Sequence, residues 1–205
     1  MNNSSVKISY DVKKLAPIPS VSLPPVKTCP RGVPCAKKGE CYVLNYLGRR
    51  PSVAASYDRN LAILREDPAA YWIQVKTAAV ANKYFRYHVS GDIPDIEYLD
   101  NMVMTATEFP GTKFLAFTKA HKIINDYVRD GGTIPENLII IFSAWGKELR
   151  PVNPYNFPVA ELVQPGDVIP DDWKLCGGNC FDCACRGVGC WQLQRGEVIA
   201  FAKHK

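Results

Sequence analysis

Cysteines are the side chains of this sequence best suited to chemistry, and the eight of them fall into two groups. Five lie between residues 176 and 190, within the stretch LCGGNCFDCACRGVGCW. The first group is Cys29, Cys35 and Cys41, with five residues between neighbours. Thiolates bind soft or borderline metals such as Zn²⁺ and the irons of iron–sulfur clusters. This density and spacing predict metal sites.

The spacing within the second group favours a cluster. Cys176, Cys180 and Cys183 follow a C-x3-C-x2-C pattern, and Cys190 supplies a fourth thiol. Four cysteine thiolates hold one 4Fe–4S cluster. Zinc stays an alternative, although structural zinc sites usually show two cysteine pairs separated by a spacer. Cys185 is expected to be the odd member, because it lies too close in sequence to Cys183 for both to bind comfortably.

The first group predicts a different kind of site. Three cysteines can hold three irons of a cube and leave the fourth open to a substrate or to S-adenosylmethionine; alternatively, the other group supplies a fourth ligand. We therefore expect one or two 4Fe–4S clusters, with structural Zn²⁺ at all the cysteines as the rival. The stretch MNNSSVKISYDVKKLAP lacks the apolar core of a signal peptide. We expect a cytoplasmic, reducing environment in which disulfides are disfavoured.

The composition excludes few partners. A chain of 205 residues is long enough for one compact domain over residues 1–205. The net charge of +5 permits an anionic partner, but no block of Lys and Arg marks a nucleic-acid surface, so that partner stays open. No apolar run approaches the roughly 18 residues that span a bilayer, so no membrane partner is expected.

The middle of the chain alternates apolar strands with helices. Strands are expected over residues 6–10, 84–89, 113–118 and 138–143. Helices are expected over residues 52–66, 67–82, 94–109 and 120–129, with Ser52 and Asp67 as caps and Pro68 opening the second helix. This βαβαβ order predicts a parallel sheet with right-handed crossovers.

The fold class is therefore α/β, with a small parallel sheet that is either open or part of a (β/α) barrel. Cysteine-rich arms flank a core over residues 52–145. Residues 1–28 form an extended proline-rich arm that leads to the first group at 29–41. The chain after residue 145 is expected to be irregular and leads to the second group at 176–191.

Polar residues follow the three core strands, at the edge where parallel α/β sheets bind ligands. The candidate cofactor-binding residues are His88, Ser90, Gly91, Asp92, Thr118 and Ser143. Ser90, Asp92 and Lys119 are the candidate catalytic residues: Asp92 could take an amino group, and Lys119 a carboxylate or phosphate. The alternatives are a helix cap for Ser90 or Asp92, a core histidine at His88 and a solvated Lys119.

Three stretches carry a resemblance to a known family: TCPRGVPCAKKGECY, FRYHVSGDIPDIEYLDNMVMTATEFPGTKFLAFTK and CGGNCFDCACRGVGCW. Over roughly residues 28–191 the chain resembles the gene product 88 family of phages and prophages. Members of that family look like shortened relatives of radical S-adenosylmethionine enzymes. The resemblance implies an iron–sulfur protein on a partial (β/α) barrel.

In those enzymes a three-cysteine loop follows the first strand, and a turn after the second binds the methionine amino group. Cys29, Cys35 and Cys41 match the loop by position, and residues 90–92 match the turn. The usual loop spacing is C-x3-C-x2-C, which here occurs only in the second group.

The leading interpretation is an iron–sulfur enzyme of radical S-adenosylmethionine type or descent. It would act on a small molecule or nucleotide and take electrons from a donor protein. One alternative is a non-catalytic module whose cysteines hold structural zinc or a cluster, since such sites contribute folding energy directly. A second alternative is an electron carrier with two clusters.

Overall fold

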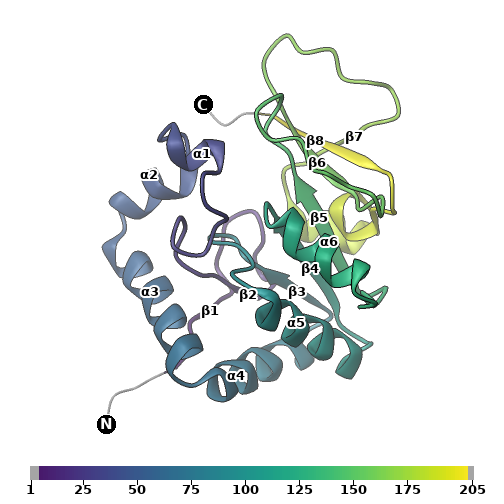
Figure 1. Cartoon of the computed structure of the whole chain (residues 1–205). Coiled ribbons are helices and arrows are strands. Elements are labelled where there is room, and N and C mark those ends of the chain that lie inside the picture. Colours follow the sequence, from purple (N-terminus) through teal and green to yellow (C-terminus); the bar gives the residue numbers. More distant parts are fainter. Residues whose placement is uncertain (1–4, 203–205) are drawn as a thin grey trace.

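The computed structural model describes residues 5–202 and contains one mixed sheet with helices in front of it (Figure 1). The strands are β1 (Ile8–Ser9), β2 (Ser20–Val21), β3 (Tyr84–Tyr87), β4 (Lys113–Thr118), β5 (Leu138–Ser143), β6 (Val159–Val163), β7 (Lys174–Leu175) and β8 (Val198–Ala202). Their spatial order is β1-β2-β3-β4-β5-β6-β8-β7. Only the β1–β2 pair in this described sheet is antiparallel.

The helices are α1 (Pro34–Lys37), α2 (Tyr42–Gly48), α3 (Pro51–Glu66), α4 (Pro68–Val80), α5 (Ile96–Glu108), α6 (His121–Arg129) and α7 (Cys180–Arg186). A short 3-10 helix, η1 (Gly189–Gln192), follows α7. Among the described residues, none of these helices has the length and apolar character that crossing a membrane requires.

The predicted βαβαβ core is confirmed. Strands β3, β4 and β5 lie side by side and parallel, with α5 and α6 in the two connections. The bounds of β4 and β5 agree with the predicted ranges, and β3 ends two residues earlier than expected. The described sheet has two free edges, at β1 and β7, so it is open and closes no barrel.

The two arms contribute more to the sheet than the sequence predicted. The proline-rich arm supplies β1 and β2, and β2 pairs in parallel with β3. The segment after residue 145, expected to be irregular, supplies β6, β8 and β7, which extend the sheet beyond β5. Its prolines obscured this pattern, because they lie in the connections, outside the strands VAELV and VIAFA.

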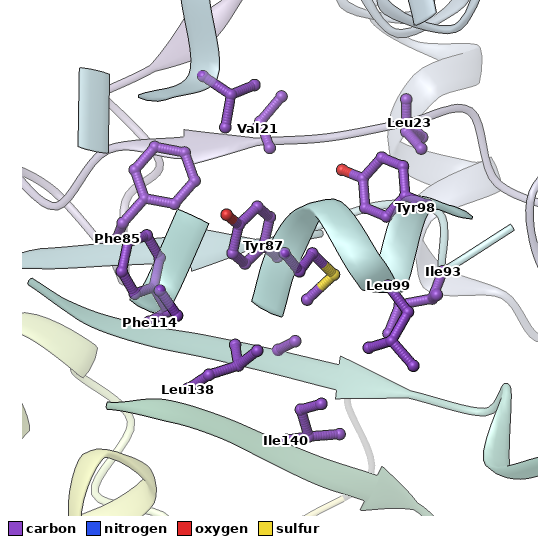
Figure 2. Packing of buried hydrophobic residues seen from close by; sticks show 14 of the residues in the cluster. Val21, Leu23, Phe85, Tyr87, Ile93, Tyr98, Leu99, Phe114, Leu138 and Ile140 are labelled. Atoms are coloured by element: carbon purple, nitrogen blue, oxygen red, sulfur yellow. The ribbon is translucent and has the colours of Figure 1, made fainter. Parts of the chain in front are cut away.

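Helices cover one face of the sheet. Alternate residues of β3, β4 and β5 pack there against α4, α5 and α6 in the main apolar cluster. Figure 2 shows part of this cluster, in which the rings of Phe85, Tyr87 and Phe114 from the sheet lie together. β4 and β5 have buried residues on both faces, as in parallel sheets covered by two layers, whereas Tyr84 and Arg86 of β3 are half-buried.

The C-terminal arm covers the opposite face. Leu115 and Ile141 project there and pack with Trp191 and Leu193, which follow the second cysteine group. Leu15 of the N-terminal arm joins the same cluster. The cysteine-bearing arm therefore acts as the second layer of the fold.

The helix starts confirm one predicted cap and correct two others. Asp67 caps α4 by accepting a hydrogen bond from the Ala70 N–H (2.9 Å). Ser52 caps nothing, because α3 begins one residue earlier at Pro51, whose fixed φ suits the first helical position. Asp95 caps α5, which leaves Asp92 free for another role.

The N-terminal arm is tied to α3 by the fully buried side chain of Asn60. Its Oδ1 accepts from the Lys7 N–H (2.7 Å), and its Nδ2 donates to the carbonyls of Lys7 (3.1 Å) and Ser22 (3.0 Å). We predict that Asn60→Ala lowers the free energy of unfolding by about 2–4 kcal/mol, because buried backbone groups lose their partners. Urea titration would measure this change.

The matched control is Asn101→Ala, since the Asn101 amide makes one local hydrogen bond, to the Glu97 carbonyl (2.8 Å). Its expected cost is below about 1 kcal/mol. Equal losses in the two variants would contradict the role given to Asn60.

Candidate functional site

The buried carboxylate of Asp92 joins the carboxyl ends of β3 and β4. It accepts hydrogen bonds from Thr118 Oγ1 (2.5 Å), the Lys119 N–H (2.8 Å) and the Ile93 N–H (2.8 Å). Burial raises the pKa of Asp92, and these hydrogen bonds oppose that rise. Three of the predicted site residues, Asp92, Thr118 and Lys119, are thus brought together at the predicted edge.

The loop after β3 also contacts the N-terminal arm. Gly91 has a left-handed backbone (φ +79°), and a Cβ there would lie 2.7 Å from both the Leu23 carbonyl oxygen and Thr28 Oγ1. Thr28 Oγ1 in turn accepts from the Asp92 N–H (3.2 Å). The close approach that Gly91 permits is therefore to the arm itself, and this contact delivers Cys29 to the edge of the sheet.

The first cysteine group gathers around Lys119. Burial raises the pKa of Cys29, whose thiol also feels the charges of Asp92 and Lys119. Cys35 in α1 donates a hydrogen bond to Cys41, which directly precedes α2; this lowers the pKa of Cys41 to about 6 and raises that of Cys35. The charge of Lys119 lowers the pKa of all three thiols.

A small cavity of about 140 Å³ lies beside this group. Cys29 and Thr28 line one part of it, and Ile93 and Lys119 line another. The edge predicted to bind ligands is therefore hollowed beside Cys29, and Lys119 lines the same cavity.

The second cysteine group lies on the sheet face opposite the helices. Cys176, Cys180, Cys183 and Cys190 pack at the border of the second apolar cluster, close enough to affect one another's ionisation. Burial raises the pKa of Cys180 and Cys183, and that of Cys190 to about 12. Cys185 is exposed. The four thiols assigned to one site from their spacing are thus neighbours in space.

Local structure shapes the loop that carries these four thiols. Asn179 caps α7 by accepting from the N–H groups of Phe181 (3.0 Å) and Asp182 (3.1 Å). A Cβ at Gly189 would lie 3.3 Å from the sulfur of Cys183, and one at Gly177 3.4 Å from it. The loop therefore closes tightly around this sulfur.

Trp191 fixes the cysteine-bearing arm to the sheet. Its Nε1 donates to the Cys180 carbonyl (3.1 Å), and its ring lies edge-on to Tyr84 of β3 with centroids 5.0 Å apart. The Tyr84 hydroxyl donates to the Ala184 carbonyl in α7 (2.9 Å). Packing and hydrogen bonds thus hold the second group in place independently of its thiols.

The donor set of each group is rich in sulfur. Within residues 5–202, no three or more Cys, His, Asp or Glu side chains converge closely enough to hold a single metal ion. A cubane cluster places its irons at separate corners, so its thiolates need not meet at one point. Soft thiol donors suit iron and sulfur as well as zinc.

Arg86 is a site residue that the sequence analysis missed. Its guanidinium lies 4.4 Å from the Phe117 ring centroid, and its Nε donates to the Tyr87 carbonyl (3.2 Å). Its positive charge opposes the effect of burial on the pKa of Cys180 and Cys190. The available signal was a lone arginine inside the apolar strand YFRY, on the face that alternation assigns to the C-terminal arm.

Of the remaining predicted residues, His88 and Ser143 have structural partners, whereas the Ser90 side chain has none within the described part of the chain. His88 is buried with a left-handed backbone (φ +56°), and its Nε2 lies 3.0 Å from the Tyr98 hydroxyl of α5. Among the described residues, neither His88 Nδ1 nor Ser90 Oγ has a hydrogen-bond partner. The Ser143 carbonyl lies 3.1 Å from Nε2 of His121. The contacts of His88 fit the alternative of a core histidine.

Fold and site together define an α/β protein with a mostly parallel sheet and two separate thiol groups, one at the carboxyl edge and one on the sheet face opposite the helices. Residues 2–165 match the model of the gene product 88 family, and the chain belongs to that family. The match starts before the resemblance expected over residues 28–191 and stops before the second cysteine group. Comparison with curated proteins and with solved structures finds no significant match.

Two buried histidines predict a pH-dependent stability. Burial lowers the pKa of His88 to about 3 and that of His121 to about 4, against about 6.5 in the unfolded chain. Below pH 6.5 the unfolded state therefore binds more protons, and stability falls as the pH falls toward these values. Each histidine should contribute a slope of about 1.4 kcal/mol per pH unit between its two pKa values.

Urea unfolding at several values between pH 7 and pH 4.5 would measure this slope. His88→Asn, whose side chain tolerates the left-handed backbone, should fold with lower stability but lose stability less steeply below pH 6.5. A slope equal to that of the unsubstituted chain would show that His88 is not its source.

Proposed function

We propose that this protein is an iron–sulfur enzyme with two thiol sites of different roles. The second cysteine group would hold a 4Fe–4S cluster, and the first would form an open three-thiol site at the carboxyl edge of the sheet. One observation carries the proposal: the fold gathers seven of the eight cysteines, from both arms, into a group of four and a group of three.

The second group fits a closed cluster. Its four donors are all thiols, as in proteins that hold a 4Fe–4S cluster by cysteine alone. Arg86 lies near enough to lower the pKa of two of these thiols, and a positive charge there would favour thiolates and an anionic cluster. Gly177 and Gly189 leave space beside the sulfur of Cys183 that a side chain would fill.

The first group fits a site open to a further ligand. Three thiols would leave one iron of a cube without a protein ligand, and such a cluster supplies one-electron chemistry when bound. We propose S-adenosylmethionine or the substrate as that further ligand, because Lys119 offers a cation for a carboxylate or phosphate beside the three thiols.

The neighbouring residues would position this ligand. The Asp92 carboxylate accepts hydrogen bonds from the Lys119 N–H and the Thr118 hydroxyl. It therefore fixes the backbone from which the Lys119 side chain extends. We assign Asp92 as a positioning residue and Lys119 as the residue that contacts the ligand. The small cavity is lined by both Cys29 and Lys119 and would admit the ligand's reactive end.

A second candidate function is a non-catalytic module with a structural metal. The observation that favours it is the place of the second group, which lies outside the family match and joins the C-terminal arm to the sheet. Zinc or a cluster at this position would contribute folding energy directly. The metal content of the purified protein distinguishes the two candidates.

Anaerobic purification followed by iron, sulfide and zinc analysis tests the second group. We expect brown protein with about four or eight irons per chain and absorption near about 400 nm. Cys190→Ser should lose about four irons, because it removes one of the four thiols. The matched control, Cys185→Ser, changes the exposed cysteine of the same loop and should retain all iron. Colourless protein with one or two zinc ions, or equal iron loss in both variants, would overturn the proposal.

The first group has its own test. Cys35→Ala should remove cluster-dependent activity and the spectral change that S-adenosylmethionine produces on the reduced protein, while the cluster of the second group stays in place. Residual absorption and iron content, measured on the same sample, would report that second cluster. If Cys35→Ala leaves the response to S-adenosylmethionine intact, the first group is not the open site.

A further inference from the structure

A larger hollow lies along α6 and shares Lys119 with the small cavity beside the first cysteine group. Its volume is about 560 Å³, which is within the range of small-molecule binding sites. Residues of α6 line one wall, and the segment 150–155 that follows β5 lines the other. It therefore lies beside the carboxyl ends of β4 and β5, where ligands bind in parallel α/β sheets. We call it the α6 groove.

The lining of the α6 groove is cationic. Lys119 and the α6 residues Lys122 and Arg129 contribute three of its cations, and Arg150 of the segment 150–155 contributes the fourth. Asp126 is the single acidic lining residue, so the lining carries four positive charges and one negative. Lys122 and Arg129 both pair with Asp126, and Arg129 also pairs with Asp130, which does not line the groove. Exposed pairs of this kind are weak, so an incoming anion can compete for both cations.

Arg150 is held in place by a buried carboxylate of β6. Its Nη1 pairs with Glu161 Oε2 at 3.1 Å, and Glu161 is buried in β6, where its other oxygen accepts the Gly146 N–H (3.0 Å). The guanidinium itself stays exposed toward the groove. Cations thus come from two elements, α6 and the 150–155 segment, and face the same space.

Beyond Arg150, the wall formed by the segment 150–155 is apolar. Val152, Pro154 and Tyr155 line it, and Val152 is 75% exposed. Asn125 of α6 donates to the Val152 carbonyl (2.7 Å), while its Oδ1 is buried and has no hydrogen-bond partner among the described residues.

We propose that the α6 groove binds a nucleotide, with its phosphate on the cations of α6 and Arg150 and its planar ring along the apolar wall. Several cations from two elements suit a phosphate, which has more charge and more acceptor oxygens than a carboxylate. Lys119 lines both hollows, so a ligand in the groove reaches toward the first cysteine group. As a substrate assignment the inference rests on the proposed function, whereas the binding itself needs no cluster.

Isothermal titration calorimetry with the four common ribonucleoside 5′-monophosphates tests the inference, with the free nucleosides and inorganic phosphate as partial probes. We expect at least one nucleotide to bind more tightly than either of its parts. The double variant Lys122→Ala, Arg129→Ala should weaken that binding at least tenfold, because it removes two cations from one wall. Both side chains are exposed, at 85% and 61%, so the variant should fold.

Arg65→Ala on α3 is the matched control, since it removes an exposed cation outside the groove and should leave binding unchanged. Absence of nucleotide binding, or equal binding by the double variant and the unsubstituted protein, would overturn the inference. Inorganic phosphate that binds as tightly as the nucleotide would also overturn it, because the apolar wall would then contribute nothing.

The same samples separate this inference from the proposed function. Brown protein that binds no nucleotide would overturn the groove inference and leave the iron–sulfur proposal standing. Colourless protein that binds nucleotide at the α6 groove would support the groove inference and overturn the iron–sulfur proposal.

Discussion

The carboxylate of Asp92 is the interaction on which the carboxyl edge of the sheet depends. A buried carboxylate is costly unless it is well hydrogen-bonded, and this one takes donors from Thr118 and Lys119 on β4 and its loop. The Asp92 N–H donates a hydrogen bond to Thr28 Oγ1 of the N-terminal arm. One residue therefore connects two strands with the arm that carries the first cysteine group, and Lys119 gains its position among the thiols from this connection.

The strands of the core could be predicted because the apolar runs and helix-end residues that define them lie within short stretches of sequence. Runs such as KFLAFT and NLIIIFS are apolar on both faces, and Gly131 and Asp67 mark helix ends by backbone conformation or capping. The strands β2 and β7 could not be predicted in this way. Each is two residues long, and its hydrogen bonds come from distant partners, β3 and β8, that only the folded chain brings near.

The candidate site was predictable in its residue types and less so in its arrangement. The spacing of the second cysteine group singled out Cys185, which is the exposed one. Asp92 was singled out as a site residue with a helix cap as the alternative, and Asp95 makes the cap of α5 instead. Arg86 was missed since its importance depends on which face of β3 the C-terminal arm covers.

The second cysteine group lies beyond the family match, yet the matched part of the chain depends on the arm that carries it. Leu115 and Ile141 belong to the matched residues and are buried beneath Trp191, Leu193 and Ile199 of the arm. Without that cover, β4 and β5 would expose a broad apolar face to water, which soluble folds avoid. The packing role of the arm is therefore separate from the role of its thiols. Trp191 and its neighbours cover the apolar face of the sheet, and the four cysteines at the border of the cluster are not needed for that cover.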